Sequence, residues 1–289
     1  MAYIKLTLIS LNPIVYEGNA MSIKSTITTL PDGREIYCVN AYEVNFSVNE
    51  IFNDELLTHG IKLPIDGTFI DVGANIGLFS LFLLDKCPQS NIFAYEPMPE
   101  PFFALQKNLT GKAQVYSMGL GIEPGELSFE YFPGISALSS SNPVISNEMS
   151  RGLRRVLLEP SGDADVNEIL DKTGANQRIQ LEPDFVEQLF VAQKVIAPID
   201  TLSNQIDKLD IHNIDLLKID TEGSEKDVLA GISEAHWLLI QQLVVEVHLG
   251  KEETYLMEQE FKNRGYKTVV GFHPLASSGA PVFHIYATR

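Results

Sequence analysis

The chain has 289 residues, of which 45% are hydrophobic, and its formal net charge is −17. Such a chain can bury the core of one large domain, or of one domain with an inserted segment. The strong acidic charge, without a stripe of lysine and arginine, disfavours nucleic acids as partners. The two cysteines, Cys38 and Cys87, have neither the spacing of a zinc site nor that of a disulfide framework.

No apolar run in the sequence has the length of a membrane span. The run at residues 78–84 is far shorter than the roughly 20 residues that cross a bilayer. Residues 1–10 lack a basic region followed by a cleavage site, and they are expected to form a strand. We therefore expect a soluble, cytoplasmic protein without a membrane partner.

Residues 22–40 predict a β-hairpin, because two β-rich runs flank the turn residues Pro31-Asp-Gly33. Ser47 and Glu50 have the spacing of a capping box, which predicts that a helix begins at Ser47. We expect residues 1–60 to form a cap over one side of the sheet or of a cofactor. The rest of the chain is expected to form the main domain.

The stretch Thr68-Phe-Ile-Asp71-Val-Gly73-Ala-Asn75-Ile-Gly77 predicts a strand, a glycine turn and a helix, the opening of a nucleotide-binding α/β unit. Glycine in such a turn permits a positive φ angle and lets a ligand approach the backbone. In the dinucleotide fingerprint G-x-G-x-x-G the second glycine admits the pyrophosphate, and Asn75 stands there instead. A cofactor without a diphosphate therefore fits better than a nicotinamide dinucleotide.

A carboxylate ends the next predicted strand, at residues 91–96. Glu96, followed by Pro97, lies about 25 residues beyond the acid of the first strand, near the interval at which doubly wound folds place the acid that binds ribose hydroxyls. Residues 113–121 predict a third strand that ends in a glycine-spaced loop. The backbone at Gly119 in that loop is a candidate contact for an adenine ring.

Residues 134–193 interrupt the regular pattern of strands and helices. They contain clustered serines at 136–141, an arginine group at 151–155, and short helix-like pieces at 167–170 and 184–190. A long irregular segment within a compact domain is usually functional, so we expect an inserted lid over the substrate. The arginines fit an anion-binding site or a solvated helix face equally well.

Regular order returns after the insertion. Further strands are predicted at 214–220, at 239–248 and, as a closing antiparallel pair, at 267–271 and 281–286. The first of these strands ends with Asp220, and the second ends with Glu246 and His248. The whole pattern predicts an α/β fold with a doubly wound, seven-stranded sheet over residues 61–289.

Ligands of open α/β sheets bind outside the carboxyl ends of the strands. The ionisable side chains predicted at that edge are Asp71, Glu96, Asp220, Glu246 and His248. Glu246 and His248 are two residues apart in a strand, so their side chains point to the same face. These residues form the candidate site.

The motifs together resemble those of the FkbM family of S-adenosylmethionine (SAM)-dependent methyltransferases. The matching segments are residues 69–77, 94–97, 198–202 and 215–225. The resemblance implies a Rossmann-like class I methyltransferase that methylates a hydroxyl of a small molecule, free or carrier-bound, such as a polyketide, peptide or sugar intermediate of natural-product biosynthesis. It implies that the residues that bind SAM are Asp71, Gly73, Asn75, Gly77, Glu96, Pro97, Gly119 and Asp220.

The candidate catalytic residues are Asp220, Glu246 and His248. His248 can take the proton of the acceptor hydroxyl directly, with an acid orienting its ring. Alternatively, the three side chains hold Mg²⁺, which lowers the pKa of the hydroxyl, although this ion prefers oxygen ligands to histidine. In a third interpretation His248 only caps the strand, and Asp220 hydrogen-bonds the loop.

Other functions remain compatible with the sequence. A SAM-dependent N-methyltransferase would need no strong base, because its acceptor amine is already neutral. A catalytically silent SAM-binding module that regulates a partner is a second alternative. The sequence leaves the oligomeric state open.

Overall fold

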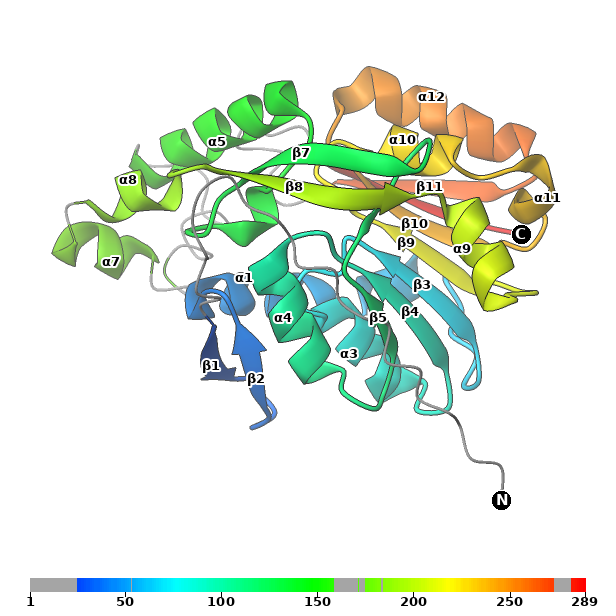
Figure 1. Cartoon of the computed structure of the whole chain (residues 1–289), viewed down its shortest axis with the longest axis horizontal. Helices are drawn as coiled ribbons and strands as arrows, with labels where there is room; N and C mark the ends of the chain where they lie inside the picture. Colours follow the sequence, from blue (N-terminus) through cyan, green and yellow to red (C-terminus); the bar gives the residue numbers. More distant parts are fainter. Residues whose placement is uncertain (1–24, 53, 159–170, 172–174, 183, 273–281) are drawn as a thin grey trace.

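The computed structural model describes residues 25–52, 54–158, 171, 175–182, 184–272 and 282–289. Its centre is a seven-stranded sheet with the strand order β11-β12-β10-β9-β3-β4-β5 (Figure 1). The strands are β3 (Thr68–Val72), β4 (Asn91–Tyr95), β5 (Gln114–Tyr116), β9 (Leu216–Ile219), β10 (Gln242–Val247), β11 (Lys267–Phe272) and β12 (Phe283–Thr288). The five strands from β5 to β10 pair in parallel, and β12 runs antiparallel to both of its neighbours. The predicted seven-stranded α/β sheet with a closing antiparallel pair is confirmed.

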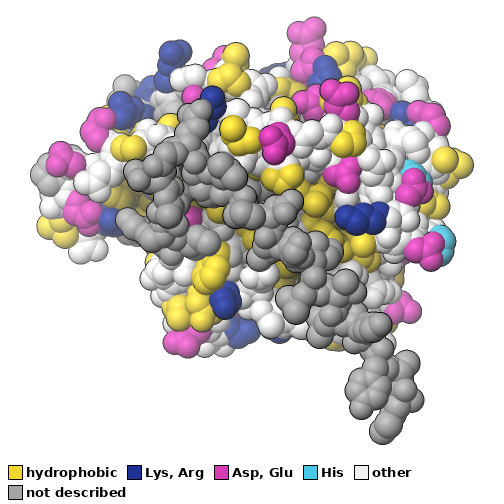
Figure 2. All heavy atoms as spheres, in the orientation of Figure 1, with side chains coloured by type: hydrophobic (Ala, Val, Ile, Leu, Met, Phe, Trp, Pro, Cys, Tyr) yellow, Lys and Arg dark blue, Asp and Glu magenta, His cyan; other side chains and the backbone are white. Residues whose placement is uncertain are grey.

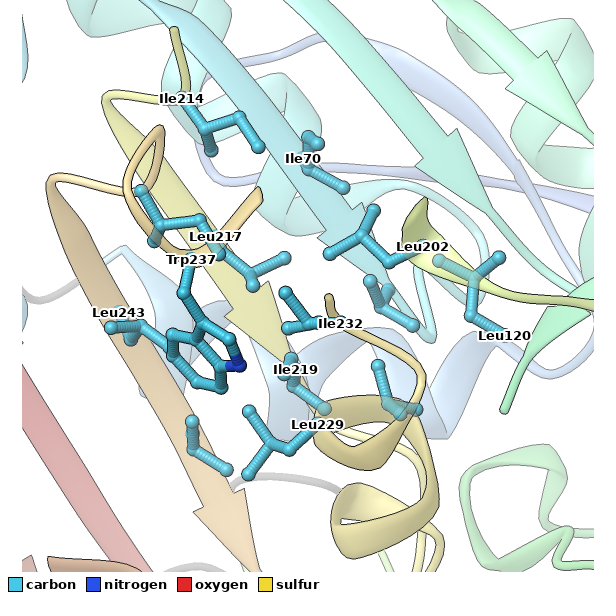
Figure 3. Packing of buried hydrophobic residues seen from close by; sticks show 14 of the residues in the cluster. Ile70, Leu120, Leu202, Ile214, Leu217, Ile219, Leu229, Ile232, Trp237 and Leu243 are labelled. Atoms are coloured by element: carbon cyan, nitrogen blue, oxygen red, sulfur yellow. The ribbon is translucent and has the colours of Figure 1, made fainter. Parts of the chain in front are cut away.

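Helices cover both faces of this sheet. Alternate residues of a strand point to opposite faces, so Ile70 and Leu217 belong to one hydrophobic cluster, and Phe69 and Leu216 belong to another. Trp237 packs in the same cluster as Leu217, as Figure 3 shows. The helices are α3 (Leu78–Lys86), α4 (Pro99–Asn108), α9 (Leu202–Leu209), α10 (Glu225–Ala230), α11 (Glu234–Trp237) and α12 (Gly250–Asn263).

The N-terminal hairpin is confirmed, with strands β1 (Thr26–Thr29) and β2 (Glu35–Cys38) paired antiparallel. The predicted start of the following helix at Ser47 is wrong. Helix α1 (Ala41–Ile51) begins earlier and α2 (Glu55–Thr58) follows it, so Ser47 lies inside a helix and caps nothing. The reason is that an apolar stripe at helical spacing, Val44, Val48 and Ile51, packs against the main domain and begins before Ser47. The strand expected at residues 1–10 lies outside the described residues.

A second, three-stranded sheet lies beside the first. Its strands are β6 (Gly119–Leu120), β7 (Gly125–Tyr131) and β8 (Gln193–Asp200), in the order β6-β8-β7. The prediction of a single strand at 113–121 is therefore wrong, because the chain leaves the main sheet after Tyr116. Gly119 permits this crossing, since a Cβ atom there would lie 2.7 Å from Cδ1 of Ile199.

The insertion contains more regular structure than its sequence indicated. Its elements are the 3₁₀-helix η1 (Ser136–Leu138) and the helices α5 (Pro143–Leu158), α7 (Ala175–Leu181) and α8 (Phe185–Leu189). Figure 1 shows α5, α7 and α8 gathered at one end of β7 and β8. The helix α5 was not predicted, although Asn142 and Pro143 mark its start: the side chain of Asn142 accepts hydrogen bonds from the backbone of Val144 and Ile145. The piece expected at 167–170 lies outside the described residues.

The surface agrees with the acidic composition. On the face drawn in Figure 2, Lys and Arg side chains lie in small, separate groups among Asp and Glu side chains. Among the described residues, no helix combines the length and the apolar character that a membrane span requires.

Candidate active site

A cavity of about 520 Å³ opens at the carboxyl ends of β3, β4, β9 and β10. Helix α1, the 3₁₀-helix η1 and helices α5 and α8 contribute the opposite wall. Of the predicted site residues, those that line this cavity are Gly73, Asn75, Glu96, Pro97, Gly119, Asp220, Glu246 and His248. The predicted cofactor residues Asp71 and Gly77 do not line this cavity, and Asp71 is fully buried, where it accepts a hydrogen bond from Ser80.

Gly73 and Gly77 are required by close packing around the turn after β3. Both have positive φ angles, +75° and +90°. A Cβ atom on Gly73 would overlap the backbone oxygen of Asp220, and one on Gly77 would lie 2.8 Å from Cδ1 of Leu105. The sequence suggested that residue 73 is a glycine because a ligand needs the space there. The structure gives a different reason for this glycine, because the turn after β3 touches the loop after β9.

Glu96 closes the same turn from the end of β4. Its Oε2 accepts a hydrogen bond from the backbone N–H of Asn75 at 2.9 Å, and its Oε1 accepts one from Met98 at 2.7 Å. Burial raises the pKa of Glu96 to about 7, and the two backbone hydrogen bonds partly oppose that shift. Because each carboxylate oxygen has two lone pairs, one acceptor position remains on each oxygen for a ligand.

Lys218 was not singled out from the sequence, but it lies at the floor of the site. Its Nζ donates to the carboxylate of Asp220 at 3.0 Å and lies 3.6 Å from that of Asp71. Burial alone would lower the pKa of Lys218, but Asp220 and Asp71 raise it above the ordinary value. Burial raises the pKa of Asp220 to about 6, with Lys218 opposing the shift. Through its ion pairs with Asp71 and Asp220, Lys218 therefore links the carboxyl ends of β3 and β9.

His248 lies just after β10, and carboxylates face both of its ring nitrogens. Nδ1 is 3.0 Å from Glu225, while Nε2 is 3.2 Å from Glu222 and 3.5 Å from Glu246. Burial opposes the charged ring, but Glu222 and Glu225 raise the pKa of His248 well above its ordinary value. Both ring nitrogens of His248 therefore have carboxylate partners within the site.

Glu222 and Glu225 were not among the site residues predicted from the sequence. Closely spaced acids are common in the first turn of a helix, where the helix dipole favours them. The insertion holds their loop in place. Ser140 donates to the backbone oxygen of Glu222, and Ser141 hydrogen-bonds Ser224 at 2.8 Å. The insertion thus holds the loop on the acidic side of the cavity, and these two of its clustered serines form structural hydrogen bonds.

The remaining wall of the cavity is mostly apolar, although Glu43 and Glu50 of the cap also line it. The apolar side chains that the cap and the insertion contribute include Phe46, Ile51, Leu138, Met149, Leu153, Val156, Leu157, Phe185 and Leu189. The three clustered arginines do not line this wall. Arg154 instead pairs with Glu187 at 2.5 Å on the surface, which favours the interpretation of a solvated helix face.

The fold and the site define a class of protein. A mixed seven-stranded sheet with one reversed strand, a glycine turn after β3 and an acid at the end of β4 is the arrangement of Rossmann-like, class I SAM-dependent methyltransferases. The profile of the methyltransferase FkbM domain matches residues 71–268. The chain belongs to this FkbM family of methyltransferases.

Curated relatives agree with this assignment. The 31-O-demethyl-FK506 methyltransferase FkbM of Streptomyces tacrolimicus is 34% identical over 269 residues, which cover 90% of this chain and 95% of that protein. The AMB antimetabolite synthetase AmbE of Pseudomonas aeruginosa is 32% identical over 223 residues, or 76% of this chain. The matched part spans only 10% of AmbE.

Among solved structures, a methyltransferase FkbM from Methylobacillus flagellatus gives a TM-score of 0.48 at 13% identity, covering 84% of this chain and 47% of that one.

Proposed function

We propose that this protein transfers a methyl group from SAM to a hydroxyl of a small, largely apolar molecule. The observation that carries the proposal is the shared cavity: the carboxylate of Glu96, the acids around His248 and an apolar wall all face one space. The cavity thereby brings together a candidate cofactor-binding carboxylate, candidate proton acceptors and an apolar surface for the methyl acceptor. Such convergence at the carboxyl ends of parallel strands is typical of α/β enzymes.

The residues present fit SAM. Glu96 keeps one acceptor position on each oxygen, as two neighbouring ribose hydroxyls require. Gly73 and Asn75 present the backbone of the turn to the cavity. Asp220 lines the cavity beside them, where its carboxylate would favour the positively charged sulfonium of SAM. When bound, SAM supplies an electrophilic methyl group whose carbon–sulfur bond breaks with the electron pair passing to sulfur.

The chain must also align the acceptor and remove its proton. As the oxygen–carbon bond forms, the hydroxyl proton leaves to a carboxylate oxygen of Asp220 or Glu246, both of which line the cavity. We assign the proton to these acids rather than to His248, because carboxylates lie within 3.2 Å of both of its ring nitrogens. Its proposed part is to hold the acids in position, a change from the direct role expected from sequence.

The apolar wall supports an acceptor with a substantial hydrocarbon part, because pockets bind such ligands mainly through apolar contact. The relative from Streptomyces tacrolimicus is named for methylation of 31-O-demethyl-FK506, which also supports an oxygen acceptor of natural-product type. An amine acceptor would not need the acids around His248, so these acids favour a hydroxyl over an amine.

The test is methyl transfer from isotopically labelled SAM to a panel of apolar alcohols, with the amine and the methyl ether of each skeleton as matched controls. We expect label in the alcohols and none in the methyl ethers. Label in the amines alone would contradict the proposal. A protein that binds SAM but labels no member of a broad panel would support a silent SAM-binding module.

A further inference from the structure

We infer that Asp220, Glu246 and His248 form a binding site for a divalent metal ion at the mouth of β9 and β10. One ligand atom from each residue lies within 4.8 Å of the other two. These atoms come from two neighbouring parallel strands, whose register places Val245 beside Ile219 and so brings the strand ends together. The three side chains line the cavity beside the glycine turn.

The orientation of His248 is that of a metal ligand. Its side chain is 1% exposed, and Nδ1 lies 3.0 Å from the carboxylate of Glu225. That carboxylate is itself held by the backbone N–H of Gly223 at 2.8 Å. A metal-bound histidine almost always donates its other ring N–H to such a partner, which fixes the ring and its tautomer. Nε2 is left facing Glu222 and Glu246, where a cation would lie.

The surroundings of these three side chains are rich in carboxylates. The ion pairs at the strand ends join five carboxylates to three basic side chains, namely Asp71, Asp220, Glu222, Glu225, Glu246, Lys218, His248 and His284. Buried carboxylates are stabilised by a cationic partner, so a site in which carboxylates outnumber basic groups suits a divalent cation.

A second group, Glu50, Glu246 and His284, meets the same distance limit and shares Glu246. We favour the first group for two reasons. It includes Asp220, whose backbone touches the glycine turn, and its histidine has the buried carboxylate of Glu225 behind it. The second group lies farther along the sheet, toward the reversed strand β12 that carries His284.

A mixed set of two carboxylates and one imidazole suits a first-row transition ion better than Mg²⁺. Mn²⁺ is the probe of choice, because it accepts both oxygen and nitrogen ligands and its free aqueous form has a measurable paramagnetic resonance signal. If the proposed function holds, the ion would also lower the pKa of the acceptor hydroxyl, and the proton would pass to the oxygen of Asp220 or Glu246 that does not hold the ion. The binding site itself is inferred without that assumption.

The experiment uses the full chain, treated with chelator, dialysed and titrated with Mn²⁺ in the absence of any methyl acceptor. We expect the wild-type protein to remove one equivalent of Mn²⁺ from the free signal. Glu246→Gln and His248→Ala should weaken binding at least tenfold. Glu225→Gln, which changes only the group behind His248, should weaken it roughly 10- to 100-fold. Glu126→Gln changes an exposed acid on the rim of the same cavity and should leave binding unchanged.

Circular dichroism and SAM affinity identify any variant that fails to fold. If a variant does not fold, the Mn²⁺ titration of the wild-type protein still tests the inference. No uptake of Mn²⁺ by the wild-type protein overturns the inference. Uptake that is lost in Glu50→Gln but kept in His248→Ala also overturns it, by moving the ion to the neighbouring group. Because no acceptor is present, these results are independent of whether the enzyme methylates oxygen or nitrogen.

Discussion

The carboxylate of Glu225 lies 3.0 Å from Nδ1 of His248, and both side chains are almost completely buried, at 0% and 1% exposure. Glu225 also accepts a hydrogen bond from the backbone of Gly223, so its position is fixed from two sides. A rigid carboxylate behind a buried imidazole determines where Nε2 of that ring points. In this protein, Nε2 points toward Glu222 and Glu246 at the cavity.

The first prediction follows from this pair. His248→Ala should lower turnover roughly 10- to 100-fold, because the acids proposed to take the acceptor's proton lose their positioning partner. SAM affinity should change little, because His248 belongs to the acceptor side of the cavity. Steady-state kinetics and calorimetric SAM titration of the same preparation measure both quantities. Turnover within twofold of wild type would contradict the role given to His248.

Glu96 should dominate the affinity for SAM. Glu96→Ala should weaken SAM binding at least tenfold, because each charge-assisted hydrogen bond to a ribose hydroxyl contributes on the order of 1.5–3 kcal/mol. Glu35→Ala is a matched control, since this glutamate is exposed on β2, away from the cavity. Isothermal titration of both variants with SAM decides the question, and equal affinities would remove Glu96 from the cofactor site.

SAM binding should depend on pH around neutrality. Burial raises the pKa of Glu96 to about 7 in the ligand-free protein, while ribose hydroxyls donate to the charged form and favour it. Below pH 7 binding must therefore release a proton, and affinity should fall as pH decreases toward 5. Above pH 7 the carboxylate is already charged, so its contribution should level off. Calorimetric titrations in buffers of different ionisation enthalpy measure how many protons are released on SAM binding. If no proton were released at pH 6, the role given to Glu96 would be contradicted.

Gly73 should be intolerant of any side chain. Gly73→Ala places a methyl group against the backbone oxygen of Asp220, whereas Gly111→Ala meets no atom within 4 Å. Both glycines have positive φ, +75° and +72°, so the two variants share the backbone strain and differ only in the clash. We expect Gly73→Ala to lower the free energy of unfolding by about 2 kcal/mol more than the control does. Denaturant unfolding measures the difference, and equal losses would refute the packing argument.

The wall of α5 should set the affinity for the acceptor. Leu153 lines the cavity, whereas Leu158 is 55% exposed on the same helix and lies outside it. Leu153→Ala should raise KM for an apolar acceptor roughly tenfold, because truncating a side chain in a hydrophobic pocket removes about 1–3 kcal/mol of binding. Leu158→Ala should leave KM unchanged. A rise in both variants would indicate a general effect on helix stability.

Much of the proposed cofactor side of the site was expected from the sequence. The glycine turn after Asp71 and the acid Glu96 at the next strand end depend on local rules, namely turn chemistry and strand periodicity. Neighbouring parallel strands end at one edge of a sheet, so Asp220, Glu246 and His248 were also expected to converge. The distances in the structure agree with that expectation.

The acceptor side was decided only by the tertiary structure. Ser140 reaches Glu222 from 82 residues away in the sequence, and Lys218 reaches Gly73 from 145 residues away. No periodicity or local motif specifies such contacts, because they depend on how separate elements pack. The surroundings of His248 have the same origin, since its carboxylate neighbours come from the strand end and from the loop and helix that pack beside it. The sequence by itself determined which residues meet at the sheet edge, and packing alone decided which carboxylates surround His248 there.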